Sequence, residues 1–208
     1  MTKFNTSHER LNPFGYLQPR VGLLPKALDH HDVVVLDDVH LGRTHIWKGM
    51  EGVLVCDIDG TIADLTHRRK YVASKPKNYP AFEKTMHLDT PIPHVIEAVR
   101  TLYYAGWTVI MCSGRSMKNR AVTIAWLEEH SVPFHDIYMR AEFREGLTTR
   151  KGDPMPDHRL DSIVKKELLD RIRAHHGEPD IAFDDRDQVV AMWRENGIPV
   201  VQVAEGDF

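Results

Sequence analysis

Two carboxylates, one residue apart, follow a short apolar run in the first third of the chain. Asp57 and Asp59 come directly after residues 53–56, and Gly60 follows them. Such a run predicts a buried strand, and two acids this close repel each other unless a cation or a reacting group lies between them. One acid could attack phosphorus while the other handles a proton. The pattern favours a phosphoryl-transfer site, and the alternative is a strand that ends in a polar turn.

A second apolar run, residues 108–112, ends in Ser113, Gly114 and Arg115. These residues supply a hydroxyl, a flexible backbone and a guanidinium, each of which offers a hydrogen-bond donor to a phosphoryl group. The same triplet is also a common turn. On its own it leaves the structural and the functional interpretation equally open.

Paired acids close another apolar run. Asp184 and Asp185 follow residues 179–183, and Mg²⁺ prefers a few carboxylate oxygens together with water and substrate phosphate. The alternative is capping of the next helix, because Asp is favoured at helix N-termini. A metal site and a cap both stay possible for this pair.

The helix expected to begin near Asp161 carries a lysine in its second turn. Lys165 lies one turn along that helix, where its charge could neutralise a nucleophilic carboxylate and a bound phosphate. The neighbouring Lys166 favours the alternative of a solvated, lysine-rich helix face.

Strand and helix patterns alternate along the chain and predict an α/β fold, a doubly wound, Rossmann-like parallel sheet. Ligands of such sheets bind beyond the carboxyl ends of the strands, where the polar motifs lie. The expected strands are residues 53–56, 108–112, 136–139, 179–183 and 198–203, and the expected helices are about residues 95–103, 117–130, 161–176 and 189–196.

Composition is that of a soluble globular protein: 42% of the 208 residues are hydrophobic and 27% are charged. A net charge of −3 argues against a broad basic face for nucleic acid. We expect no membrane span, because no apolar stretch reaches the required ~20 residues, and a cytoplasmic location, because the first residues do not form a signal peptide. Cys56 and Cys112 follow apolar residues and are expected to be buried free thiols.

Taken together, these motifs resemble the haloacid dehalogenase superfamily of phosphatases, and more narrowly the 3′-phosphatase domain of phage-type polynucleotide kinase-phosphatases. The resemblance rests on the sequence DIDGT at 57–61, Asp-Thr-Pro-x-Pro at 89–93, SGR at 113–115, D-x-R-x-D-x-x-x-K at 157–165 and the last 28 residues. It implies a phosphatase domain over residues 51–208 with a small cap insert at about 62–90. Residues 1–50 stand apart as an extension, expected to add a strand or a hairpin.

The resemblance implies a role for each motif residue. Asp57 would form an aspartyl-phosphate, and Asp59 would protonate the leaving oxygen and then activate water. Ser113 and Lys165 would hold phosphoryl oxygens. The substrate-side residues implied are Arg68, Gly114, Arg115, Arg159 and Asp161, and the Mg²⁺ ligands implied are Asp57, the carbonyl of Asp59, Asp184 and Asp185.

Two segments depart from the family pattern, the insert after the first motif and residues 141–156. The insert is too short for a large lid, and it is basic between residues 66 and 80, with two tyrosines and no acid. Basic residues interleaved with aromatic ones can contact phosphates and stack on bases, although a solvated basic loop has the same composition.

The sequence favours a Mg²⁺-dependent phosphomonoesterase that removes 3′-phosphates from DNA or RNA ends. A phosphatase of nucleotides or other small esters is the first alternative, and a non-catalytic module that binds phosphorylated ends is the second. No G-x-x-x-x-G-K-[S/T] loop occurs, so a separate 5′-kinase or ligase is an expected partner, in the host cytoplasm if the chain is phage-encoded. The oligomeric state is left open.

Overall fold

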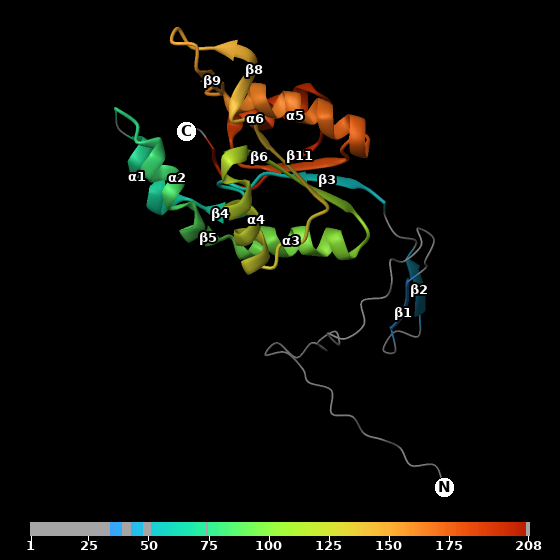
Figure 1. Cartoon of the computed structure of the whole chain (residues 1–208). Helices are drawn as coiled ribbons and strands as arrows, with labels where there is room; N and C mark the ends of the chain where they lie inside the picture. Colours follow the sequence, from blue (N-terminus) through green and yellow to red (C-terminus); the bar gives the residue numbers. More distant parts are fainter. Residues whose placement is uncertain (1–33, 39–42, 48–50, 74, 207–208) are drawn as a thin grey trace. The chain divides into compact units, whose positions relative to one another are not determined.

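The computed structural model describes residues 34–38, 43–47, 51–73 and 75–206 (Figure 1). The chain divides into two units, Met1–Gly49 and Met50–Phe208. In the first unit, β1 (Val34–Asp38) pairs antiparallel with β2 (Arg43–Trp47) as a two-stranded hairpin. The rest of the predicted extension lies outside the described residues, and its role as a separate domain stays a prediction.

The second unit is built on a sheet of five parallel strands in the order β11-β10-β3-β6-β7. These strands are β3 (Val53–Cys56), β6 (Thr108–Ser116), β7 (Asp136–Arg140), β10 (Ile181–Asp184) and β11 (Val200–Gln202). The strand of the first motif lies at the centre. The carboxyl ends of β3, β6 and β10 therefore meet at one edge of the sheet and bring the three motifs together.

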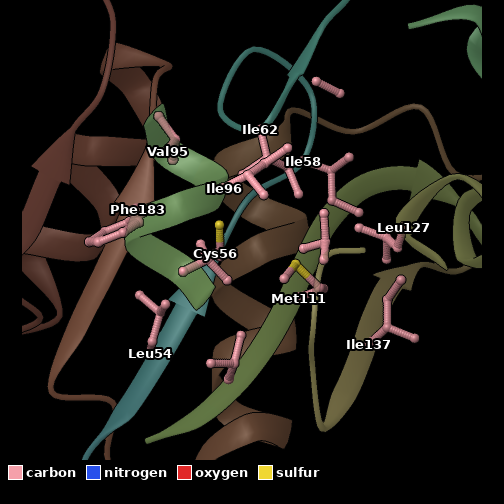
Figure 2. Packing of buried hydrophobic residues seen from close by; sticks show 14 of the residues in the cluster. Leu54, Cys56, Ile58, Ile62, Val95, Ile96, Met111, Leu127, Ile137 and Phe183 are labelled. Atoms are coloured by element: carbon pink, nitrogen blue, oxygen red, sulfur yellow. The ribbon is translucent and has the colours of Figure 1, made fainter. Parts of the chain in front are cut away.

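Helices cover both faces of this sheet (Figure 1). One face carries α3 (Pro93–Tyr104) and α4 (Arg120–Glu129), and the other carries α5 (Asp161–His176) and α6 (Asp187–Glu195). Side chains alternate across the sheet: Leu54 and Cys56 pack in the cluster under α3 and α4, whereas Val55 packs in the cluster under α5 and α6. Figure 2 shows the first of these clusters. The predicted doubly wound fold is confirmed.

The helices have apolar faces that match the sheet. Buried positions recur three or four residues apart along α5, at Val164, Leu168, Leu169 and Ile172, and burying each such side chain contributes about 1.5–3 kcal/mol. The helix begins and ends near the residues that the sequence predicts. It ends at His176 because Gly177 adopts a φ of +83°.

A small cap follows the first motif. It comprises β4 (Ala63–Asp64), α1 (Thr66–Ala73), α2 (Tyr79–Lys84), the 3₁₀ turn η1 (Met86–Leu88) and β5 (Thr90–Pro91). β4 and β5 pair antiparallel and close its base. In Figure 1 the cap lies beyond the end of β3. The side chain of Asn78 accepts a hydrogen bond from the backbone of Ala81 and caps α2. The basic segment is therefore helical at both ends, whereas Lys75 and Lys77 lie exposed in the connection between α1 and α2.

Residues 141–156 form a hairpin of β8 (Phe143–Thr148) and β9 (Pro154–Pro156). Strand β6 also differs from expectation, because it continues through the second motif to Ser116 rather than ending at residue 112. Its register with β7 shifts between Ser113 and Ser116. Such a bulge bends the strand and redirects its side chains.

Within the described ranges, no helix is long and apolar enough to cross a membrane. Cys56 and Cys112 are buried free thiols. Burial raises the pKa of the Cys112 thiol to about 12, despite the opposing charge of Lys165. Both sulfurs are therefore protonated at neutral pH.

Candidate active site

A buried lysine joins two acids from neighbouring strands. The Nζ atom of Lys165 lies 2.7 Å from Oδ1 of Asp57 and 2.8 Å from Oδ2 of Asp184. Lys165 projects from α5 and is only 3% exposed, so it does not belong to a solvated helix face. Its Lys166 neighbour instead pairs with Asp170 at the surface.

Burial and neighbouring charge set the protonation of this group. Burial raises the pKa of Asp57 well above its ordinary value, although Lys165 opposes the shift. Burial would lower the pKa of Lys165, but Asp184 and Asp57 outweigh it and raise that pKa well above its ordinary value. The lysine is therefore a fixed positive charge next to the two acids.

Three acids at this edge have the geometry of a cation site. Asp57, Asp184 and Asp185 are all buried, and each offers an oxygen within 4.8 Å of the other two. Burial and the neighbouring Asp184 raise the pKa of Asp185 to about 6. Carboxylate oxygens gathered in this way suit a hard cation such as Mg²⁺. The donor set thus fits the metal that the sequence predicts.

The backbone at Gly60 leaves room for this acid cluster. A Cβ atom at this position would lie 2.1 Å from Oδ2 of Asp185, and the φ of +87° disfavours any residue with a side chain. The alternative role at the start of a helix is seen in part, because Oδ1 of Asp184 accepts from the backbone N–H of Arg186, the N-cap residue of α6, at 3.2 Å. The other oxygen of Asp184, Oδ2, accepts from Lys165 and from the indole of Trp193.

The second acid of the first motif is held by two arginines. Oδ1 of Asp59 lies 2.7 Å from Nη2 of Arg68 and 2.6 Å from Nη2 of Arg115. Burial raises the pKa of Asp59, but Arg115 and Arg68 outweigh burial and leave it below its ordinary value. The Asp59 side chain is 27% exposed, whereas that of Arg68 is fully buried. The sequence predicted both arginines on the substrate side, and the structure brings both to Asp59.

A third acid in this network, Asp89, was not predicted as a site residue. Its Oδ1 accepts from Nε of Arg68 at 2.7 Å, and its Oδ2 accepts from Nη2 of Arg115 at 2.7 Å. The side chain is completely buried. A sequence signal for this residue was present, because Asp89 is the first residue of the Asp-Thr-Pro-x-Pro stretch that the chain shares with the family it resembles. Only the folded cap shows that this acid is paired with the arginines.

The second motif lies at the bulge in β6. Ser113 is fully buried, and its Oγ accepts a hydrogen bond from the backbone N–H of Arg115 at 3.2 Å. A Cβ atom at Gly114 would lie 2.7 Å from Oδ1 of Asp161. Gly114 therefore allows the start of α5 to approach the motif closely.

Arg140, at the end of β7, is a second residue that sequence reasoning missed. Its guanidinium donates to the carbonyl of Gly114 at 2.9 Å and to the carbonyl of Arg159 at 2.9 Å, and it also pairs with Asp161. Its position next to a short strand gave no motif from which to predict it. The residue ties the loop before α5 to the second motif.

Of the predicted substrate-side residues Arg159 and Asp161, only Asp161 lies next to the second motif. Arg159 donates to Asp157 at 2.8 Å and to Glu167 at 2.9 Å, so its described contacts lie in its own loop and helix. Asp161 accepts from Arg140 and Arg186 beside Gly114. A substrate contact by Arg159 therefore stays a prediction.

Comparison with known proteins places this geometry in a family. Residues 51–208 match the family model of the polynucleotide kinase PNKP phosphatase domain. A protein of Autographa californica nuclear polyhedrosis virus, named "Putative bifunctional polynucleotide kinase/RNA ligase", is 27% identical over 150 residues, which are 71% of this chain and 18% of the viral protein.

Two solved structures are also similar. A chain in "Structure of the Pnkp1/Rnl/Hen1 RNA repair complex" is 28% identical with a TM-score of 0.59, over 89% of this chain and 50% of that one. A chain in "Structure of Pnkp1/Rnl/Hen1 complex" is 25% identical with a TM-score of 0.58, over 100% of this chain and 58% of that one. This chain thus spans about half the length of these two relatives and 18% of the viral one.

The family match covers the whole second unit, including the sheet edge with its acids, the two arginines and the buried lysine. The predicted superfamily and enzyme class are confirmed. The chain belongs to the family of polynucleotide kinase PNKP phosphatase domains and is a phosphoric monoester hydrolase with the haloacid dehalogenase fold.

Proposed function

We propose that this chain removes 3′-phosphates from nucleic-acid ends with Mg²⁺ as cofactor and Asp57 as nucleophile. Phosphatases of this family hydrolyse phosphomonoesters through an aspartyl-phosphate. The observation that carries the assignment is the contrast between two acids in one motif. Asp57 is paired with the ammonium of Lys165, whereas Asp59 is held by two guanidinium groups.

In the first step, a carboxylate oxygen of Asp57 attacks phosphorus, and the bond from phosphorus to the 3′-oxygen breaks. Lys165 lies 2.7 Å from Asp57, where its charge offsets the negative charge that develops on the phosphoryl oxygens. Ser113, in the neighbouring strand β6, would donate to one of those oxygens. The leaving oxygen takes a proton from Asp59 and departs as a hydroxyl.

In the second step, Asp59 takes a proton from a water molecule, and the water oxygen attacks the phosphorus of the aspartyl-phosphate. The acyl-phosphate bond breaks, inorganic phosphate leaves, and Asp57 is regenerated as a carboxylate. When bound, Mg²⁺ would be held by Asp57, Asp184 and Asp185, with the carbonyl of Asp59, and would supply charge neutralisation for the phosphoryl group.

The two steps require different protonation states of Asp59. In the free protein its pKa is below the ordinary value, because the charges of Arg115 and Arg68 outweigh burial. That state suits the second step, in which Asp59 is the base. A dianionic phosphate ester bound beside this carboxylate raises its pKa through like-charge repulsion. We infer that proton uptake accompanies substrate binding and prepares Asp59 for the first step.

The surface of the cap supports a nucleic-acid substrate. Lys70, Lys75 and Lys77 are exposed. Tyr79, two residues after Lys77, is 48% exposed. The Nζ atom of Lys77 lies 6.0 Å from the centre of that ring. Ammonium groups contact backbone phosphates, and aromatic rings stack on bases.

The relatives support an end-healing role. Their names refer to a polynucleotide kinase, an RNA ligase and an RNA repair complex. We infer that the reaction exposes a 3′-hydroxyl that a ligase can use, and that a 5′-kinase and a ligase act on the same ends.

The deciding experiment measures Mg²⁺-dependent phosphate release from three substrates: a 3′-phosphorylated oligonucleotide, a 3′-mononucleotide and a 5′-mononucleotide. We expect the highest kcat/KM for the oligonucleotide. A preference for either mononucleotide would overturn the end-healing proposal and favour a small-molecule phosphatase.

The nucleophile is tested by Asp57→Asn. We expect phosphate release to fall at least about a thousand-fold, as is typical when a covalent nucleophile is removed. Asp170→Asn, at the surface pair with Lys166, is the matched control and should keep full activity. Turnover of Asp57→Asn near the parent's level would assign the nucleophile elsewhere.

A further inference from the structure

We propose that Tyr79 of the cap and His158 of the loop before α5 form one stacking surface for a nucleobase near the 3′ end of the substrate. The inference rests on the proposed function and adds the residues that would distinguish a polynucleotide from a simple phosphate ester. The two rings come from segments 79 residues apart in the sequence. They lie nearly parallel, with 19° between their planes and 6.3 Å between their centres.

The face of α2 that carries Tyr79 points at the active site. Residues three and four positions apart share one face of a helix, so Tyr79, Phe82 and Glu83 lie together. The ring of Phe82 lies 4.1 Å from the guanidinium carbon of Arg68, which holds Asp59. Tyr79 is therefore one helical turn from a side chain that packs on the catalytic network.

The same face touches the segment that follows the second motif. Glu83 forms an ion pair with Lys118 at 2.8 Å, and Lys118 lies in η2 (Met117–Asn119), directly after β6. The cap helix thus spans from the end of β6 to the loop that carries His158. The stacked pair Tyr79 and His158 is therefore a second contact of this helix with the rest of the domain, beside the Glu83–Lys118 ion pair.

The backbone on both sides of His158 is fixed next to the second motif. Arg140 donates to the carbonyls of Asp157 and Arg159, and also to the carbonyl of Gly114. His158 itself is exposed. A ring on a fixed loop, one residue from the contacts that anchor it to Gly114, is positioned at the border of the site.

Both rings belong to exposed residues, and a lysine lies over the ring of Tyr79. Tyr79 is 48% exposed, and Lys77 lies over its ring at 6.0 Å. Base stacking on aromatic side chains tolerates every base, since each has a flat π face. The lysine can then meet the backbone phosphate next to the stacked base. This combination suits binding of a nucleic-acid strand end regardless of its base sequence.

The test compares kcat/KM of the full chain and of Tyr79→Ala, Tyr79→Phe and His158→Ala. The substrates are a 3′-phosphorylated trinucleotide, the same trinucleotide with an abasic site at either of its last two positions, and para-nitrophenyl phosphate. We expect both alanine variants to lose about 5- to 100-fold on the trinucleotide, mainly through KM, because a stacked base contributes this much by alanine substitution. Tyr79→Phe keeps the ring and should retain most of the parent's value.

On one of the two abasic trinucleotides, and on para-nitrophenyl phosphate, the variants should match the parent. Tyr104→Ala is the control and should change nothing, because Tyr104 lies on α3, outside the cap, and is 77% exposed. Equal losses on all substrates would overturn the inference, because they would indicate a structural role. So would an unchanged kcat/KM on the trinucleotide.

A different result would contradict the proposed function itself, namely that the parent shows no preference for the trinucleotide over para-nitrophenyl phosphate. If that preference exists and the Tyr79 and His158 variants keep it, only the stacking surface is wrong.

Discussion

Nη2 of Arg68 lies 2.7 Å from Oδ1 of Asp59 and joins the cap to the acid that is proposed to transfer the proton. Arg68 belongs to α1 and is fully buried. One of its donors, Nη1, has no hydrogen-bond partner among the residues that the structure describes.

Asp89 is predicted to position both arginines. In Asp89→Asn, the loss of one charge leaves Arg68 and Arg115 with a single acid between them, and breaking a buried ionic network typically costs about 3–5 kcal/mol. We expect a lower free energy of unfolding in urea and a kcat reduced at least about ten-fold, because Asp59 loses its fixed orientation. Glu97→Gln, at an exposed pair with Arg100, should change stability by less than about 0.5 kcal/mol. Parent-like stability and kcat in Asp89→Asn would contradict this role.

Gly60→Ala tests the space around the acid cluster. The new Cβ would lie 2.1 Å from Oδ2 of Asp185, so the acid must move and Mg²⁺-dependent activity should fall by at least about a hundred-fold, as 1 Å shifts of catalytic groups do. Gly152→Ala is the matched control, because Gly152 has a similar φ of +88° with nothing within 4 Å of the added Cβ.

Gly152→Ala should lose at most about 1–2 kcal/mol of stability through backbone strain and keep its activity. Magnesium titrations of activity for the two variants give the comparison. If both lose activity to the same extent, strain alone accounts for the effect and the contact with Asp185 does not matter.

Magnesium is expected to stabilise the folded chain. A ligand that binds only the folded state at a concentration of 100 Kd adds about 2.7 kcal/mol, so Tm should rise on addition of Mg²⁺ to chelator-treated protein. Asp185→Asn removes one of the three clustered acids and should reduce the rise. Asp187→Asn, at an exposed position of α6, should leave it unchanged. An equal rise in all three proteins would indicate binding elsewhere.

Acid stability should depend on Asp157. Hydrogen bonds from Arg159 lower the pKa of this carboxyl from 3.8 to about 2, against the effect of burial. A lowered pKa adds stability that is complete above the unfolded value and is lost as the pH falls through the folded value. The stability difference between the parent and Asp157→Asn should therefore be constant above about pH 5 and shrink between about pH 4 and pH 2. Urea midpoints across this range measure it, with Asp170→Asn as the surface control.

Much of the fold follows from local sequence, because apolar periodicity and glycine positions decide strands and helices. The helix Asp161–His176 was predicted at about these bounds, since its apolar spacing and Gly177 agree. The extent of β6 was not, because its last residues are polar and are held in the strand only by pairing with β7. The β8–β9 hairpin carries no alternating apolar pattern, so its sequence indicated only an insertion.

The site was predictable where its residues lie at or near the carboxyl ends of the central strands. Parallel strands deliver their carboxyl ends to one edge, so Asp57, Ser113 and Asp184 had to meet there. Asp89 and Arg140 come from outside those motifs, and their partners are set by the folding of the cap and by the loop before α5. Spacing in the sequence contains no information about such contacts.

The location of Arg68 in the cap ties the orientation of Asp59 to two separate parts of the fold. Arg68 reaches both Asp59 and Asp89 from α1, whereas Arg115 reaches the same two acids from β6. The two arginines and the two acids thus form a closed ring of ion pairs across the junction of cap and sheet. The acid proposed to transfer the proton is therefore oriented by the cap and the sheet together, and a change in how the cap packs would be felt at Asp59.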